Sequence, residues 1–194
     1  MRVVAGRLRG RALKAPAGDL TRPTGARVKE ALFSILGDVQ GASVLDLYAG
    51  SGALGIEALS RGASRAVFVE AARPALVCLR ENLSKLGLER EAHVISSRVQ
   101  AARAALSAHA PFDLVLCDPP WRDVAAALVE LVALAGSGLI AVTARIAVEH
   151  SAKEPLAFEP TSGLVIVDAR SWGDTAVTFV TSARPEPSET VTLA

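Results

Sequence analysis

The sequence is poor in the residues that form disulfide frameworks and metal clusters. Its 194 residues include only two cysteines, three histidines and one tyrosine, and aromatic residues make up 4% of the chain. Cys78 and Cys117 lie in apolar surroundings and lack a C-x-x-C spacing, which is typical of reduced thiols in a core. We therefore expect neither disulfides nor a metal cofactor.

Long hydrophobic runs are also missing. The most apolar stretch runs for 14 residues from Leu131 to Ala144, between Glu130 and Arg145. This is shorter than the roughly 18 apolar residues that suggest a membrane span. The first residues, M-R-V-V-A-G-R-L-R-G-R, lack the apolar core of a signal peptide. We expect a cytoplasmic protein that does not bind membranes.

Charge is nearly balanced over the whole chain but not along it. The formal net charge is +1, yet residues 1–30 contain eight Lys or Arg against two acidic residues. A basic segment of this kind is typical of contact with an anionic polymer such as a nucleic acid. A solvated basic strand pair without a partner is the alternative interpretation.

Regular alternation of strands and helices dominates the middle of the chain. A hydrophobic content of 51% in 194 residues allows one good core with an appendage. Apolar runs and breakers predict strands at residues 43–48, 66–70, 93–96, 112–117, 145–149, 164–170 and 176–181, and helices at 24–36, 53–62, 74–86, 99–107 and 123–134. This order predicts an α/β fold with a doubly wound, mainly parallel sheet and one antiparallel strand near its edge.

The basic N-terminal segment is predicted to form a small hairpin followed by a helix. Residues 2–14 alternate apolar and basic residues around two glycines, with Arg7, Arg9, Arg11 and Lys14 facing outward. Thr24 is expected to cap the helix, whose apolar side comprises Val28, Ala31, Leu32, Ile35 and Leu36. Arg22, Arg27 and Lys29 would then lie at the helix start or on its polar face. That arrangement favours phosphate binding, unless the arginines hold carboxylates of the main domain.

A glycine-rich turn follows the first predicted strand of the regular region. Residues 44–55 read V-L-D-L-Y-A-G-S-G-A-L-G, which is a strand, a tight turn and the start of a helix. Such a turn brings the backbone close to a ligand, but the G-x-G-x-x-G spacing alone also fits an NAD-binding unit. Glu70 ends the next strand, where a carboxylate can accept both hydroxyls of a ribose. Asp46 is expected to cap loop amides or to meet a ligand's ammonium group through water.

A second motif, Asp118-Pro119-Pro120-Trp121, follows the predicted strand at 112–117. The prolines hold the backbone rigid, so a carboxylate, a backbone carbonyl and an aromatic face are presented together at the carboxyl edge of the sheet. These groups suit an exocyclic amine on a flat base: Asp118 and the Pro119 carbonyl accept hydrogen bonds from its two N–H groups, while Trp121 stacks on the ring. A rigid loop with a core tryptophan is the structural alternative.

Together these motifs resemble the class I S-adenosylmethionine-dependent methyltransferases that modify exocyclic amines. The chain resembles more narrowly the bacterial family that methylates guanine N2 in 16S, the small-subunit, ribosomal RNA. That family has a G-x-x-R-G-R-x-L hairpin, found at residues 6–13, and an R-P-T-x-x-R-V-(K/R)-E-x-L-F helix, found at residues 22–33. Its late aromatic-G-D-T turn matches residues 172–175.

The resemblance implies a fold, a cofactor and a set of site residues. The fold would be a Rossmann-like methyltransferase domain over residues 38–183 with a seven-stranded sheet, an RNA-contacting extension at 1–37 and a disordered tail at 184–194. S-adenosylmethionine would contact Asp46, Tyr48, Ala49, Gly50, Gly52, Glu70, Ala71, Ser97 and Asp118. The target guanine would meet Asp118, Pro119, Pro120 and Trp121, and RNA would meet Arg7, Arg9, Arg11, Arg22, Thr24 and Arg27.

One departure from the family pattern concerns the adenine of the cofactor. The family often has an acidic residue after the third strand of the regular region, where this chain reads Ser96-Ser97-Arg98-Val99. Adenine recognition would then rest on backbone groups or Ser97, with no such role for Arg98.

The expected substrate is a guanine of 16S ribosomal RNA, within the small subunit or its assembly intermediate. The alternatives are a methyltransferase acting on DNA adenine or protein glutamine, a nucleotide-binding oxidoreductase and a non-catalytic RNA-binding module.

Overall fold

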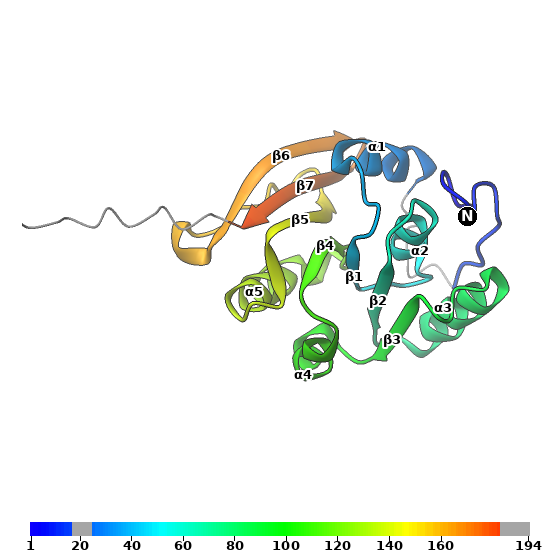
Figure 1. Cartoon of the computed structure of the whole chain (residues 1–194). Coiled ribbons are helices and arrows are strands. Elements are labelled where there is room, and N and C mark those ends of the chain that lie inside the picture. Colours follow the sequence, from blue (N-terminus) through cyan, green and yellow to red (C-terminus); the bar gives the residue numbers. More distant parts are fainter. Residues whose placement is uncertain (17–24, 183–194) are drawn as a thin grey trace, which may run out of the picture.

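Seven strands form one mixed sheet in the computed structural model of the chain, which describes residues 1–16 and 25–182 (Figure 1). Its strands are β1 (Ser43–Leu47), β2 (Arg65–Glu70), β3 (Ala92–Ser96), β4 (Phe112–Cys117), β5 (Ile140–Ser151), β6 (Leu164–Trp172) and β7 (Thr175–Ser182). Its α-helices are α1 (Ala26–Leu36), α2 (Ala53–Ser60), α3 (Arg73–Leu86), α4 (Arg103–Leu106) and α5 (Val124–Gly136). Four short 3₁₀ helices are η1 (Val99–Ala101), η2 (Ser107–His109), η3 (Trp121–Asp123) and η4 (Pro160–Ser162).

The strand order is β3-β2-β1-β4-β5-β7-β6. Strands β1 to β5 pair in parallel, and β7 pairs antiparallel with both β5 and β6. The predicted doubly wound sheet with one antiparallel strand next to its edge is therefore confirmed. The chain leaves β1 toward β2 and β3 on one side and later returns to place β4 on the other, so β1 and β4 flank the point where the strand order reverses.

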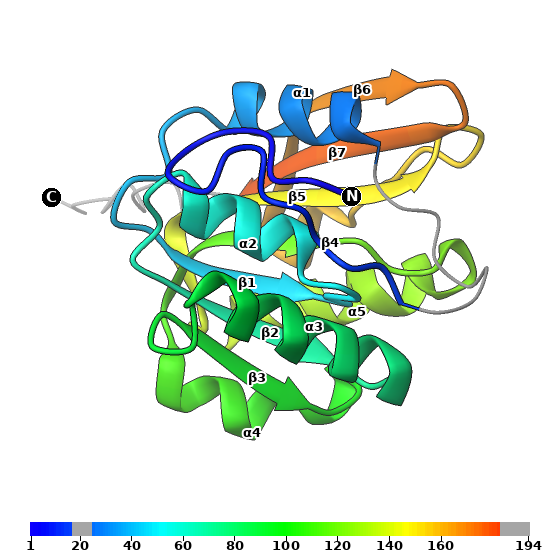
Figure 2. The same ribbon diagram turned by 90° about the vertical axis from the view of Figure 1, so that its right-hand side faces the viewer.

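Helices cover both faces of the sheet. Figures 1 and 2 show α1, α2 and α3 on one face together with the N-terminal arm (residues 1–16), while α4 and α5 lie on the other face. The central strands β1 and β4 are buried on both sides because each face there packs against helices, whereas β6 at the edge is largely exposed. The first core includes Leu32 and Phe33 of α1, Leu59 of α2 and Leu79 of α3, and the second includes Leu131 of α5.

The arm reverses direction as predicted but forms almost no ladder of its own. One antiparallel bridge joins Arg2 to Ala12, and the Val3 N–H donates to the Arg11 carbonyl at 3.0 Å. Val3 and Leu13 enter the same core as α2 and α3. The arm is thus shaped mainly by the helices beneath it; the proposed division between residues 37 and 38 stays a prediction.

Helix α1 differs from its prediction in two ways. Gly25 occupies the N-cap position without a side-chain cap, and the predicted cap Thr24 lies outside the described residues, as does Arg22. The predicted faces are also partly wrong: Ile35 is 40% exposed, whereas Phe33 and Lys29 are buried. The buried face of α1 is rotated relative to the predicted apolar face because α1 packs against α2 as well as the sheet. Helix α2 also supplies a carboxylate partner for Lys29.

Two further boundaries differ from the predictions. The helix predicted at residues 99–107 is broken into η1, α4 and η2, although Val99, Ala102 and Leu106 still pack into the second core. Alanine-rich sequence favours helix but does not show where the chain turns. Strand β5 starts at Ile140 rather than Arg145. Its pairing with β4 jumps from Phe112–Ile140 to Leu114–Arg145, a bulge that apolar periodicity does not reveal.

Within residues 1–16 and 25–182, no helix is long and apolar enough to cross a bilayer. The predicted tail at 184–194 falls outside the described residues.

Candidate functional site

The two sequence motifs meet at the carboxyl edge of the sheet. Leu47 at the end of β1 is in register with Cys117 at the end of β4, and the Asp118 N–H donates to the Leu47 carbonyl at 3.3 Å. The glycine turn and the proline pair therefore begin side by side at the point where the strand order reverses. In open α/β sheets this crevice is where ligands bind.

The glycine loop, residues 48–55, needs its glycines for two different reasons. Gly50 and Gly52 have φ angles of +56° and +80°, and Tyr48 is the non-glycine residue of the described chain with positive φ, at +59°. A side chain at Gly52 would lie 2.4 Å from Leu79, and one at Gly55 would lie 2.4 Å from Phe68. Only glycine allows both the left-handed turn and the close packing of α2 on the sheet.

Asp46 lies beneath this loop and not in the open crevice. Its side chain is 1% exposed, and Oδ2 accepts the Gly55 N–H at 2.8 Å. Burial raises the pKa of Asp46 well above its ordinary value, the Gly55 hydrogen bond opposes this, and the charges of Asp118 and Glu70 add to it. The role as a cap on a loop amide is confirmed; direct contact with a ligand stays a prediction.

Glu70 ties the glycine loop to the start of α3. Oε2 accepts the Gly50 N–H at 2.8 Å, while Oε1 accepts the N–H groups of Ala71 at 2.8 Å and Ala72 at 2.7 Å. The carboxylate is only partly buried, and each oxygen has more than one lone pair. Glu70 is therefore held in a fixed position where it can still accept the hydroxyls of a ribose.

Ser97 and Gln100 border the same edge beyond β3. The Ser97 N–H donates to the Glu70 carbonyl at 3.0 Å, and its hydroxyl donates to the Arg98 carbonyl. Gln100 Nε2 donates to the Tyr48 hydroxyl at 3.5 Å, and burial raises the pKa of Tyr48 to about 12. Gln100 was not among the predicted residues, because nothing in the sequence shows that η1 faces the glycine loop.

The proline motif presents an aromatic face to solvent. Pro119 is buried and Asp118 partly buried, while Trp121 at the start of η3 is 40% exposed. The Asp123 N–H donates to the Pro120 carbonyl at 2.7 Å and closes the turn. Because the tryptophan is so exposed, the alternative of a core tryptophan is wrong.

These groups fit S-adenosylmethionine as a ligand. A Cβ added to Gly50 would meet only the Tyr48 carbonyl, at 3.9 Å, so there is room directly above the loop. Glu70 offers carboxylate oxygens, the loop offers its backbone, and Ala49 is held by its N–H bond to Val69 at 3.1 Å. Among the residues that the structure describes, no three His, Cys, Asp or Glu side chains form a metal-sized cluster.

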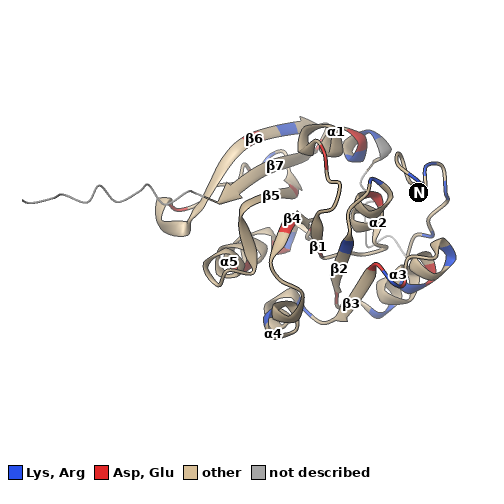
Figure 3. Cartoon of the chain, viewed as in Figure 1, with Lys and Arg blue, Asp and Glu red and all other residues tan. Residues whose placement is uncertain are grey.

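The predicted RNA contacts lie apart from this crevice. Arg7, Arg9 and Arg11 are exposed residues of the arm, and Arg27 is exposed near the start of α1. Figure 3 shows Lys and Arg residues along the arm. Arg7 pairs with Glu91, and Lys14 pairs with Glu81 at 2.5 Å. Arg9 and Arg11 make no ion pair with any described residue, so both are available to an anionic partner.

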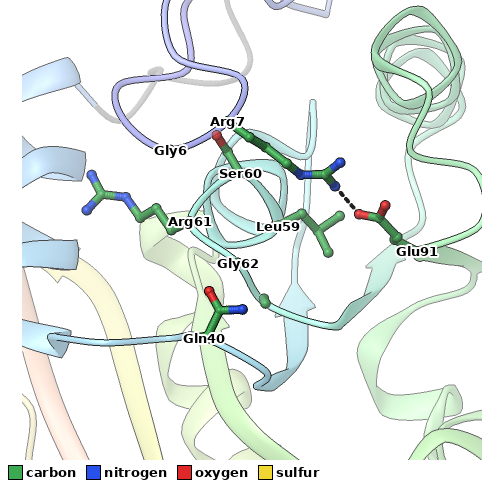
Figure 4. A pocket seen from close by; sticks show the side chains of 9 residues that line it. Gly6, Arg7, Gln40, Leu59, Ser60, Arg61, Gly62 and Glu91 are labelled. Carbon is green, nitrogen blue, oxygen red and sulfur yellow. Dashed lines mark hydrogen bonds and ion pairs between the residues drawn. The ribbon is translucent and has the colours of Figure 1, made fainter.

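A surface hollow of about 460 Å³ lies near the amino ends of β1, β2 and β3, opposite the carboxyl ends that carry the two motifs (Figure 4). Its lining includes Arg7, Gln40, Arg61 and Glu91, from the arm tip and from the segments that precede β1, β2 and β3. A smaller hollow of about 240 Å³ lies beside His150 on β5 to β7. Neither contains a residue of the glycine loop or of Asp118–Trp121, so the chemistry of the carboxyl edge marks the candidate site.

Sequence reasoning missed two buried polar side chains that hold the N-terminal arm, one of which also bonds the glycine loop. Glu57 of α2 is fully buried and accepts the N–H groups of Val4 at 2.8 Å and Ala5 at 2.9 Å. Asn82 of α3 is 1% exposed and bonds the arm and the glycine loop. Each stands within an apolar helix stripe, and this is the one signal that could have identified it.

Solved structures with related sequences share this fold. The structure of protein yhhF from Escherichia coli is 34% identical, covers 94% of this chain and 97% of that chain, and has a TM-score of 0.79. A hypothetical protein of Thermus thermophilus, TTHA0928, is 33% identical, with 93% and 99% coverage and a TM-score of 0.77.

The sequence relatives carry names that agree with the motifs. Ribosomal RNA small subunit methyltransferase D of Escherichia coli K12 is 41% identical over 123 residues, which is 63% of this chain and 61% of that protein. The protein of the same name in Haemophilus influenzae is 38% identical over 124 residues, 63% of this chain and 64% of that protein. The resemblance seen in the sequence is thus confirmed. Because the family model described as conserved hypothetical protein 95 matches residues 1–181, arm and sheet together, the chain belongs to that family.

Proposed function

We propose that the protein transfers a methyl group from S-adenosylmethionine to the exocyclic N2 amine of a guanine in 16S ribosomal RNA. The observation that carries this proposal is the junction of the glycine loop and the Asp118–Trp121 motif at the neighbouring ends of β1 and β4. A cofactor on the loop and a base on the motif would lie next to each other. The names of the sequence relatives support ribosomal RNA as the substrate.

The proposed cofactor contacts are those that the family resemblance implies. Tyr48, Ala49, Gly50 and Gly52 would contact the methionine end of the cofactor, with Asp46 beneath them bonding the Gly55 N–H. Glu70 and Ala71 would contact the ribose, and Ser97 the adenine, with Gln100 beside it. When bound, S-adenosylmethionine supplies an electrophilic methyl group on a positively charged sulfur.

The remaining chemistry belongs to the proline motif. An aryl amine is a weak nucleophile because its lone pair is delocalised into the ring. Asp118 and the Pro119 carbonyl would accept hydrogen bonds from its two N–H groups. These hydrogen bonds favour a tetrahedral nitrogen with its lone pair aimed at the methyl group. Trp121 would stack on the base, and Pro120 keeps the turn rigid. The methylated nitrogen carries a positive charge and then loses a proton to Asp118 or water.

RNA would be held by the basic N-terminal segment. Phosphate contacts supply affinity, while the target base leaves its stack to reach the crevice. Arg9 and Arg11 are unpaired within the described chain and are the strongest candidates, with Arg7 and Arg27 beside them; Arg22 and Thr24 complete the predicted set. We propose that the protein acts in the cytoplasm on the small subunit or its assembly intermediate.

The test is methylation of purified small ribosomal subunits and naked 16S ribosomal RNA, with the modified nucleotide mapped by mass spectrometry. We expect N2-methylguanine at one position. Asp118→Ala should lower kcat by about 100-fold or more, as loss of a transition-state contact does, whereas Asp123→Ala, which removes a carboxylate five residues later, should keep most of the activity. Full activity of Asp118→Ala would refute the mechanism.

The same methylation assay, run beside binding measurements with S-adenosylmethionine and NADH, separates the alternatives. Methyl transfer to DNA or to protein, but not to ribosomal RNA, would show that the substrate is DNA or protein. Binding of NADH instead of S-adenosylmethionine would indicate an oxidoreductase. RNA binding without binding of either cofactor would indicate a non-catalytic module.

A further inference from the structure

Asn82 joins the N-terminal arm to the glycine loop. Its side-chain oxygen accepts the Lys14 N–H at 2.8 Å, and its Nδ2 donates to the Lys14 carbonyl and to the Ser51 carbonyl, each at 3.0 Å. Cys78, one turn earlier on α3, also donates to the Lys14 carbonyl, at 3.1 Å. One buried amide therefore holds both backbone groups of an arm residue and a carbonyl of the loop.

These contacts constrain the conformation of the loop. The Ser51 carbonyl belongs to the same peptide group as the Gly52 N–H, which donates to the Ala49 carbonyl at 2.7 Å. Because both the carbonyl and the N–H of that peptide group are hydrogen-bonded, the left-handed turn at Gly52 is fixed just ahead of α2. Both hydrogens of the Asn82 amide are used, so the loop and the arm cannot shift independently without leaving a buried donor unpaired.

The arm depends on such side chains because only one antiparallel bridge and a few backbone hydrogen bonds join its two halves. At its tip, Ser60 of α2 donates its hydroxyl to the Ala5 carbonyl at 2.5 Å and accepts the Leu8 N–H at 2.9 Å. Those contacts anchor the arm without touching the glycine loop. Figure 2 shows the arm passing over α2 and along α3 toward the end of β1. Asn82 thus bonds the end of the arm that is nearest the loop.

We propose that Asn82 is a positioning residue that couples the glycine loop to the arm, so that occupation of the loop by the cofactor orders the arm and RNA on the arm tightens cofactor binding. A ligand that rigidifies the loop reduces the entropy lost when the arm is ordered, and this linkage is reciprocal. The inference rests on the proposed function, which assigns cofactor to the loop and RNA to the arm.

The test uses S-adenosylhomocysteine as the probe and compares the native chain with Asn82→Ala and Ser60→Ala. Hydrogen exchange is followed at the Leu13 amide, which donates to the Met1 carbonyl at 3.0 Å and does not touch Asn82. In the native chain and in Ser60→Ala, the probe should slow exchange at Leu13 at least about fivefold, the lower end of typical couplings. In Asn82→Ala it should bind about tenfold more weakly, within the same range of couplings, and at saturation it should leave Leu13 exchange unchanged.

A second measurement follows the same coupling from the RNA side. In vitro transcribed 16S ribosomal RNA should tighten binding of the probe to the native chain and to Ser60→Ala, and should not do so with Asn82→Ala. If Asn82→Ala fails to fold, Asn82→Asp replaces it, because aspartate still accepts the Lys14 N–H but donates nothing to Ser51.

Equal slowing of Leu13 exchange in the Asn82 variant and the native chain would overturn the inference. Failure of the native chain to bind the probe would instead refute the proposed function. Coupling seen with a product other than N2-methylguanine would leave the inference standing and correct only the substrate.

Discussion

At the scale of single residues, Asp46 accepts the Gly55 N–H, but its buried charge lowers the stability of the fold. The carboxylate is buried, and burial raises its pKa well above the ordinary value of 3.8. The folded state therefore binds its proton more tightly than the unfolded state does. Stability attributable to this group is greatest at low pH and falls as the pH rises above about 3.8 toward the folded-state pKa.

Asp46→Asn should therefore change the pH dependence of folding. Asparagine can still accept the Gly55 N–H but never carries the buried charge. We expect the variant to gain stability relative to the native chain as pH rises, by about 1.4 kcal/mol for each unit by which the pKa is raised. Urea unfolding at about pH 4.5 and about pH 8 measures the gain. An identical difference at both pH values would contradict the expectation.

The two thiols give a second test at this scale. Cys78 and Cys117 are 3% and 1% exposed, and burial raises the pKa of both thiols. Because the thiolate is the reactive form, a disulfide reagent should label neither thiol of the folded protein at about pH 8 and should label both in denaturant. A labelling rate in the folded protein within about tenfold of the denatured rate would show that one thiol is accessible.

Residue roles were predictable where they depend on local backbone. The glycines of the loop and the proline pair are recognised from sequence because turn geometry requires those residue types. The burial of Lys29 could not be predicted in this way. Its partner Glu57 lies on a different helix, and only packing of α1 on α2 brings the two together at 3.1 Å.

At the scale of elements, Glu57 clamps the arm, α1 and α2 together. Lys29 Nζ lies 3.1 Å from its Oε2 and donates to the Arg2 carbonyl at 2.8 Å. Arg61 Nε donates to Oε1 at 2.9 Å, and its guanidinium stacks on Phe33 at 4.7 Å from the ring centre. The buried carboxylate is thus satisfied only while all three elements are in place.

Lys29→Met should therefore destabilise the fold strongly. Without Lys29, the buried Glu57 carboxylate keeps Arg61 but loses its buried cation, and the Arg2 carbonyl loses its donor. Loss of one partner of a buried ion pair costs about 3 kcal/mol. We expect a loss of this size in urea unfolding, and a smaller loss for Lys29→Met combined with Glu57→Gln than for Lys29→Met alone. Lys14→Met at the exposed pair with Glu81 is the control and should change stability little. Equal losses for Lys29→Met and Lys14→Met would contradict this account.

The bounds of helices and strands were predictable where the apolar pattern of the sequence is clear. Strand β4 was predicted with the correct bounds because its mostly apolar residues stand between Pro111 and Asp118-Pro119. The helix expected at residues 99–107 was not, because alanine-rich sequence says little about where a chain turns. The bulge in β5 depends on its neighbour β4 and leaves no periodic signal.

At the scale of the whole molecule, the arm carries two arginines, Arg9 and Arg11, that pair with no acidic residue in the described part of the chain. Arg9→Ala with Arg11→Ala should weaken binding to 16S ribosomal RNA and lower the slope of log K against log salt by up to about 2, since each phosphate contact contributes nearly one unit. Filter binding between roughly 50 and 200 mM salt, a range over which phosphate contacts lose much of their affinity, provides the measurement.

The matched control removes two arginines elsewhere. Arg103 on α4 and Arg170 on β6 are exposed and lie outside the arm. Arg103→Ala with Arg170→Ala changes net charge equally and should leave the salt slope unchanged. Equal effects of both double variants would indicate a nonspecific charge effect instead of an arm site.

The sequence alone determined the kinds of groups this protein uses: a glycine turn, a rigid carboxylate and aromatic motif, a basic N-terminus and a parallel sheet. These are local properties, because backbone dihedrals and apolar periodicity depend on neighbouring residues. Only the tertiary structure decided which groups meet. Residues 47 and 117 become neighbours through the sheet, and Asn82 reaches both Lys14 and Ser51 because α3 packs beside α2, a contact between segments far apart in the chain.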